Sequence, residues 1–167
     1  MAVRERNQGI KLRHGITKNG ASVVVSPDLD GVDLDERYGA ALGLPVVVVH
    51  KERVSGDEVA VQAITGDVKG QLPLIVDDMI STRGTIEAAA RALMAAGCEP
   101  CITVAATHGL LVGQAVSRLE QIPLRRLYVS NSVVMPSPGA LPVQEVDLSV
   151  ILAESIRGIY EGGHIIH

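Results

Sequence analysis

Five short apolar runs set the strongest constraint on how this chain folds. They are rich in Val, Leu, Ile and Ala, and they cover residues 21–26, 45–49, 72–76, 102–106 and 124–129. Runs that are apolar on both faces are typical of strands buried in a parallel sheet. The segments 33–42, 85–96, 113–121 and 153–160 read as helices. This alternation predicts an α/β fold with a doubly wound, mainly parallel sheet and helices on both faces.

The size and composition of the chain favour a single domain. It has 167 residues, of which 47% are hydrophobic, enough to bury one core. We expect residues 21–167 to form the α/β domain and residues 1–20 to be an N-terminal segment of unclear role. With no Phe or Trp and only three Tyr, the chain offers few aromatic faces on which a nucleobase could stack.

The charge of the chain argues against two classes of partner. The net charge is −4 and the pI is near 5.7, and no basic patch stands out. Nucleic acids and anionic membranes attract clustered positive charge, so we expect neither as a partner. Residues 1–20 lack the apolar stretch of a signal peptide, and no later run is long enough to span a membrane. We therefore expect the protein to be cytoplasmic.

The two cysteines form a Cys98-Glu99-Pro100-Cys101 motif that superficially resembles a redox pair or half of a zinc site. Gly97 is placed as a helix C-terminus, and the negative end of a helix dipole raises a thiol pKa rather than lowering it. A zinc site would also need two further ligands nearby. We expect two ordinary, partly buried thiols.

The segment that follows the run 72–76 carries the strongest functional signal. In doubly wound sheets, ligands bind beyond the carboxyl ends of the strands. There the chain places two acids, Asp77 and Asp78, and then the hydroxyl- and glycine-rich stretch Ser81-Thr82-Arg83-Gly84-Thr85 before a helix. Backbone N–H groups at a helix N-terminus bind phosphate, while carboxylates accept hydrogen bonds from a sugar diol and attract magnesium. The segment predicts a ribose 5-phosphate site, the alternative being that Asp78 only caps the turn.

Four stretches in order resemble the type I phosphoribosyltransferase family, and within it most closely the C-terminal half of ribose-phosphate pyrophosphokinases. They are Val25-Ser26-Pro27-Asp28, Lys51-Glu52-Arg53, Gly66-Asp67-Val68-Lys69-Gly70 with the acid loop after it, and Ala106-Thr107-His108-Gly109. The resemblance runs from about residue 21 to residue 157. Three positions depart from the family pattern, namely Asp30, Ser81 and Arg83.

The resemblance implies a role for individual residues. Asp28 would help to hold Mg²⁺, and Lys51 and Arg53 would be catalytic cations, Arg53 also contacting substrate. Asp77 would contact the ribose hydroxyls. The predicted substrate-binding residues are Arg53, Asp77, Asp78, Ser81, Thr82, Arg83, Gly84 and Thr85.

The implied reaction transfers pyrophosphate from ATP to ribose 5-phosphate and gives phosphoribosyl pyrophosphate for nucleotide biosynthesis. In the family, another half supplies a metal-binding His and most ATP-binding residues, and nothing in residues 1–20 replaces it. We therefore expect ATP to need a partner half. Two alternatives remain: a phosphoribosyltransferase that joins a base to phosphoribosyl pyrophosphate, and a non-catalytic regulatory subunit that binds the sugar phosphate. We also expect a homo-oligomer or a partner subunit.

Three weaker features complete the expectations. The segment 50–66 is interpreted as a flexible loop that closes over substrates, with a plain surface loop as the alternative. His108 is interpreted as structural. The acids Asp28, Asp30, Asp33 and Asp35 do not fit a calcium-binding loop, and Asp33 and Asp35 are explained as a solvated helix start at the positive end of the dipole.

Overall fold

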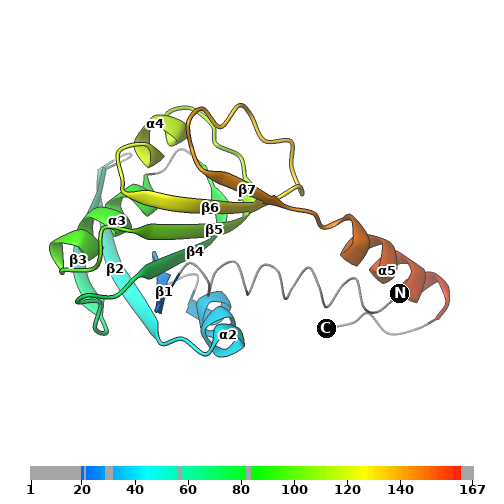
Figure 1. The fold of residues 1–167 in the computed structure, drawn as a ribbon, viewed down its shortest axis with the longest axis horizontal. Coiled ribbons are helices and arrows are strands. Elements are labelled where there is room, and N and C mark those ends of the chain that lie inside the picture. The colour runs from blue at the N-terminus through cyan, green and yellow to red at the C-terminus, as the bar shows by residue number, and fades with distance from the viewer. Residues whose placement is uncertain (1–19, 21, 29–31, 56–57, 82–83, 163–167) are drawn as a thin grey trace.

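The computed structural model describes residues 20, 22–28, 32–55, 58–81 and 84–162, and Figure 1 shows their arrangement. Seven strands form one sheet in the order β3-β2-β1-β4-β5-β6-β7. Their bounds are β1 Val23–Ser26, β2 Val46–Ser55, β3 Glu58–Thr65, β4 Pro73–Ile80, β5 Ile102–Gly109, β6 Leu124–Ser130 and β7 Val143–Val146. All neighbouring strands are parallel except β2 and β3, which are antiparallel.

Helices cover both faces of the sheet, as predicted. The helices on the sheet are α2 Val32–Leu42, α3 Thr85–Ala95 and α4 Ala115–Leu119, whereas α5 Ser149–Tyr160 follows β7 and has no buried residue. On one face, Ile86 and Leu93 of α3 and Leu119 of α4 pack into the larger apolar cluster. On the other face, Tyr38 and Leu42 of α2 pack against the smaller cluster. The doubly wound α/β class is therefore confirmed.

The core is aliphatic and centred on β1, β4 and β5. Val24, Val25, Leu74, Ile75 and Val104 have no solvent exposure. Full burial of valine, leucine and isoleucine on both faces of the central strands explains why these runs are continuous in the sequence rather than alternating.

The segment 50–66 is not a loop, so that expectation was wrong. Residues 46–55 and 58–65 pair as an antiparallel hairpin, with register shifts next to Lys51 and Ser55. The two residues at its tip, 56 and 57, lie outside the described residues. Strand β3 is mainly apolar, and its Ile64 packs against the larger apolar cluster.

Helix α5 differs from the other helices because none of its residues is buried. It extends beyond the β7 edge, away from the layered body (Figure 1). Ile151, Leu152, Ile156, Ile159 and Tyr160 are exposed along it. Among the described helices, none combines the length and apolar character needed to cross a membrane.

Candidate functional site

The site lies where the strand order reverses. Strand β2 pairs with one edge of β1, and β4 pairs with the opposite edge of β1. The chain therefore extends the sheet first in one direction from β1 and then in the other. In doubly wound sheets such a reversal opens a crevice at the carboxyl ends of the two strands. Asp28 follows β1, and Asp77, Asp78 and Ser81 lie at the end of β4. The fold therefore brings together residues that are about fifty positions apart in the sequence.

Strand β4 is longer than predicted and carries both acids. It runs to Ile80, so Asp77 and Asp78 are strand residues, and Asp77 pairs in register with Ala106 of β5. The Met79 N–H donates a 3.4 Å hydrogen bond to Asp77 Oδ1. Asp77 is half-buried and Asp78 is exposed.

Burial raises the pKa of Asp77 to about 7, and the neighbouring Asp78 and the charge of Asp28 add to the increase. The hydrogen bond from the Met79 N–H opposes it. A carboxyl with a pKa near neutrality is held among like charges and partly removed from water. A ligand that brings hydroxyl donors or a cation to this edge would stabilise the ionised Asp77 carboxylate and so lower its pKa.

The helix that follows begins with an open turn. Gly84 is the N-cap residue of α3 with φ +63°, the left-handed region, and it has no side chain to cap the helix. Its carbonyl accepts the Ala88 N–H at 2.9 Å, the first bond of the helix. Asp78 lies in β4 rather than at this N-cap, so the interpretation of Asp78 as the cap of the turn was wrong. Ser81 is half-buried, and Thr82 and Arg83 lie outside the described residues.

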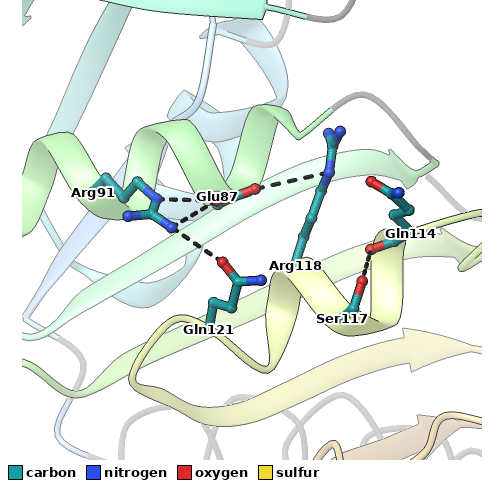
Figure 2. A network of polar contacts seen from close by, with 6 residues as sticks. All are labelled: Glu87, Arg91, Gln114, Ser117, Arg118 and Gln121. Carbon is teal, nitrogen blue, oxygen red and sulfur yellow. Dashed lines mark hydrogen bonds and ion pairs between the residues drawn. The ribbon is translucent and has the colours of Figure 1, made fainter.

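A cation that was not predicted reaches this helix start from a neighbouring helix. Arg118 of α4 points toward the first turn of α3 (Figure 2). Its guanidinium lies so close to Gly84 that a Cβ at that residue would clash with Nη1. Arg118 Nε lies 3.9 Å from Glu87 Oε2 in that turn. Glu87 also pairs with Arg91, whose guanidinium lies 2.9 Å away. No local motif marks Arg118, because the approach depends on the packing of two helices.

The carboxyl end of β5 is held by a separate polar network. His108 Nδ1 lies 2.7 Å from Ser132 Oγ. Ser130 Oγ donates to the Thr107 carbonyl oxygen at 2.6 Å, and Ser132 Oγ contacts the same oxygen at 3.1 Å. These contacts join β5 to the loop after β6. They agree with the structural role expected for His108.

At the end of β1, the structure places one acid differently from the sequence-based expectation. Asp35 of α2 is 1% exposed, so the expectation that it lies on a solvated helix start was wrong. Among the described residues, no hydrogen bond to either carboxylate oxygen meets the usual geometric limits, although the Ser26 hydroxyl lies near. Burial raises its pKa to about 6, the charge of Asp28 adds to this, and the nearby Ser26 hydroxyl opposes it. Asp35 is buried because it lies on the same face of α2 as Gly39, the face that packs against the sheet.

The described residues contain no group of three His, Cys, Asp or Glu side chains arranged to hold a metal ion. Mg²⁺ does not require such a group, because one or two carboxylates, water and substrate phosphates usually complete its coordination. Asp28, which follows β1, and Asp77 and Asp78 of β4 are the acids near this edge that could supply one or two such carboxylates.

Some predicted site residues are described only in part. The backbones of Lys51 and Arg53 lie in β2, where Lys51 pairs with Val61 and Arg53 with Val59, but their side chains are outside the described part. The same holds for Asp33 in α2, and Asp30 is not described at all. The two cysteines are free; Cys98 is buried, and burial raises the pKa of its thiol, with Glu99 adding to the effect.

Comparison with known proteins agrees with this arrangement. The ribose-phosphate pyrophosphokinase of Clostridium acetobutylicum is 36% identical over 140 residues, which are 83% of this chain and 44% of that protein. The enzyme of the same name from Chlorobaculum tepidum is 39% identical over 84% of this chain and 43% of its own length. The chain thus spans less than half the length of these curated relatives.

Solved structures give the same picture. The crystal structure of phosphoribosylpyrophosphate synthetase from Mycobacterium smegmatis matches with a TM-score of 0.77 and 30% identity, over 92% of this chain and 51% of that chain. A purine phosphoribosyltransferase from Pyrococcus horikoshii shares the fold alone, with a TM-score of 0.52 and 18% identity over 84% of this chain and 79% of that chain. The family model described as "Phosphoribosyl synthetase-associated domain" matches residues 60–166. The chain therefore belongs to the phosphoribosyl synthetase-associated domain family.

Proposed function

We propose that this domain binds ribose 5-phosphate at the β1–β4 edge and supplies the sugar-phosphate side of a ribose-phosphate pyrophosphokinase reaction. The observation that carries the proposal is the meeting of Asp28, Asp77 and the open start of α3 at the reversal of the strand order. An acid pair suits a ribose diol, and an uncapped helix start suits a phosphate dianion.

In the proposed arrangement, the 5′-phosphate lies at the start of α3, bound by backbone N–H groups and hydroxyls of residues 81–85. Asp77 accepts hydrogen bonds from the ribose hydroxyls, and Asp78 contributes a second carboxylate. Arg118 adds positive charge near Gly84. The positive helix end and this guanidinium favour a dianion over a neutral sugar.

The proposed reaction joins the anomeric hydroxyl oxygen to the β-phosphorus of ATP. The bond between the β-phosphorus and the oxygen bridging to the α-phosphate breaks, AMP leaves, and the hydroxyl proton passes to solvent or to AMP. Lys51 and Arg53 of the β2–β3 hairpin would stabilise the charge that develops on the transferred group. Asp28 would hold Mg²⁺, which when bound neutralises pyrophosphate charge.

We further propose that residues beyond this chain complete the ATP pocket. The relatives are more than twice as long as the matched segment. The chain has no Phe or Trp, and stacking of a base on an aromatic ring contributes about 1–3 kcal/mol. Without such a platform the 167 residues should bind ATP weakly.

The proposal is tested by incubating the chain with ATP, ribose 5-phosphate and Mg²⁺, and separately with phosphoribosyl pyrophosphate and each common base. We expect binding of ribose 5-phosphate with little or no AMP release by the chain alone. When a partner half restores turnover, Lys51→Ala should abolish it and leave sugar-phosphate affinity intact, because the charge is needed chiefly in the transition state. Formation of a nucleotide from phosphoribosyl pyrophosphate and a base would show instead that the domain acts as a phosphoribosyltransferase.

A further inference from the structure

The ring of His108 is held by a chain of three short polar contacts. His108 Nδ1 lies 2.7 Å from Ser132 Oγ, which lies 2.8 Å from Ser130 Oγ. Ser130 Oγ donates to the Thr107 carbonyl oxygen at 2.6 Å. A carbonyl oxygen only accepts, and a hydroxyl has one hydrogen, so the Ser130 hydrogen is used on Thr107. The Ser132 hydrogen then fills the contact with Ser130, and His108 Nδ1 must supply the hydrogen of the remaining contact.

This hydrogen count fixes the tautomer of His108. A neutral imidazole that carries its hydrogen on Nδ1 has a free lone pair on Nε2, which therefore accepts hydrogen bonds. Within the described part of the chain, no group bonds to His108 Nε2. Because Nδ1 faces Ser132 in the loop after β6, the other ring nitrogen faces away from that loop.

The register of the sheet places His108 beside the acids of β4. Met79 of β4 is the register partner of His108 in β5, and neighbouring strands lie about 5 Å apart. The Met79 amide nitrogen is also 3.4 Å from Asp77 Oδ1. The Asp77 carboxylate thus contacts the residue that lies directly beside His108. Strand β4 borders β5 on the edge opposite to β6, so this carboxylate lies on the side of β5 away from Ser132.

The shared end of β4 and β5 is open to solvent. The Met79 side chain is 42% exposed, Asp78 and Thr107 are exposed, and Asp77 and His108 are half-buried. A ligand held by Asp77 therefore has access to the neighbouring strand end, where the accepting nitrogen of His108 lies.

We propose that His108 Nε2 accepts a hydrogen bond from a hydroxyl group of the ribose 5-phosphate that Asp77 holds. The inference rests on the proposed function, to which it adds a sugar-contacting residue from β5. An ionised Asp77 and the neutral His108 ring both present acceptors, so this edge favours a ligand with several hydroxyl donors. Ser132 acts as a positioning residue that keeps the ring in its accepting tautomer. The competing role of His108 is structural alone, with Nδ1 joining β5 to the loop after β6.

Two substitutions separate these roles, because the amide of Asn overlaps the Nδ1 position of histidine and the amide of Gln overlaps the Nε2 position. His108→Asn keeps a donor for Ser132 and removes the accepting nitrogen. His108→Gln keeps an acceptor in place of Nε2 and loses the bond to Ser132. In calorimetry, His108→Asn should weaken ribose 5-phosphate binding about threefold to tenfold, as for one lost hydrogen bond, and His108→Gln less than about twofold. The reverse order would show a structural role and overturn the inference.

Nuclear magnetic resonance of the chain with isotope-labelled histidine observes the two ring nitrogens directly. At about pH 8, where an ordinary histidine is neutral, Nδ1 of His108 should carry the hydrogen and Nε2 should not. The signals lost in His108→Asn identify the residue. Ribose 5-phosphate should shift the Nε2 resonance toward that of a protonated nitrogen and leave Nδ1 nearly unchanged.

The outcomes separate the two proposals. Saturable binding of ribose 5-phosphate with an unshifted Nε2 resonance would reject the contact with His108 and leave the proposed function standing. A folded wild-type chain that does not bind ribose 5-phosphate would reject the proposed function, and the contact with His108 would fall with it.

Discussion

The guanidinium of Arg118 lies so close to Gly84 that a Cβ at that residue would clash with it. Gly84 has φ +63° and starts α3, and Arg118 comes from α4, more than thirty residues later. This approach links the predicted phosphate loop to a cation that lies outside it. The left-handed backbone conformation favours glycine at this position, and the guanidinium at the end of the flexible Arg118 side chain would have to shift to admit a Cβ.

Gly84→Ala should lower the free energy of unfolding by about 1–3 kcal/mol, since a left-handed alanine costs about 1–2 kcal/mol and Arg118 must also move. Urea denaturation measures the change. Gly43→Ala is the matched control, because Gly43 has φ +70° with nothing within 4 Å of an added Cβ. In an Arg118→Ala background, the cost of Gly84→Ala should fall to that of Gly43→Ala; an undiminished cost would show that the guanidinium exerts no steric constraint.

Asp35→Asn should stabilise the metal-free protein at high pH. The pKa of Asp35 is about 6 in the folded chain against an ordinary value of 3.8, so the folded state binds the proton more tightly. Stability from this group is fully present below about pH 4 and is lost as the pH rises to about 6. In EDTA, the variant should therefore gain about 1–3 kcal/mol over wild type at about pH 8 and little at about pH 4.

Denaturation of wild type, Asp35→Asn and Glu36→Gln across this pH range provides the measurement. Glu36 is exposed, so its variant should follow the wild-type curve. A wild-type curve parallel to that of Asp35→Asn at all pH values would mean that Asp35 keeps an ordinary pKa in the folded protein.

The sequence allowed the central architecture to be predicted, whereas the assignment of residues 77–85 as a sugar-phosphate site stays a prediction. All of Val23–Ser26 and the first four residues of both β4 and β5 are buried on both faces, and such segments appear as continuous apolar runs. The hairpin formed by β2 and β3 was missed because its charged residues, Lys51 to Arg53, suggested a loop. The short edge strand Val143–Val146 was missed because four residues with two polar members give no clear period.

Two features near the site could not be predicted from the sequence, because one depends on burial and the other on contact between residues far apart in the chain. Asp35 was explained as a solvated acid because helix starts favour acids, yet the direction of its side chain depends on how α2 lies on β1. Arg118 reaches Gly84 through the packing of α3 against α4. Neither relationship is encoded in a local spacing.

Asp77→Ala should weaken ribose 5-phosphate binding by about 1–3 kcal/mol, the range for a charge-assisted hydrogen bond, and leave the fold intact. Calorimetry and circular dichroism measure the two effects. Asp67→Asn serves as the control, because Asp67 is an exposed acid before β4 whose Oδ1 accepts the Lys69 N–H. Unchanged affinity in Asp77→Ala would place the sugar elsewhere.

The chain should self-associate through α5, where five large apolar side chains are exposed, with Ile156 at 67% and Ile159 at 61%. Contiguous exposed apolar surface of this kind is typical of interaction sites. Light scattering at tens of micromolar should give a dimer or larger, and Ile156→Ser with Ile159→Ser should reduce the mass. A monodisperse wild-type monomer would contradict this expectation.

Calorimetry of the 167-residue chain with ribose 5-phosphate in the presence of Mg²⁺ tests the central claim most directly. The account predicts saturable binding of ribose 5-phosphate, much weaker binding of ribose, which lacks the phosphate, and weak binding of ATP. A folded chain that binds ribose 5-phosphate no better than ribose would contradict the account, because the start of α3 would then hold no phosphate.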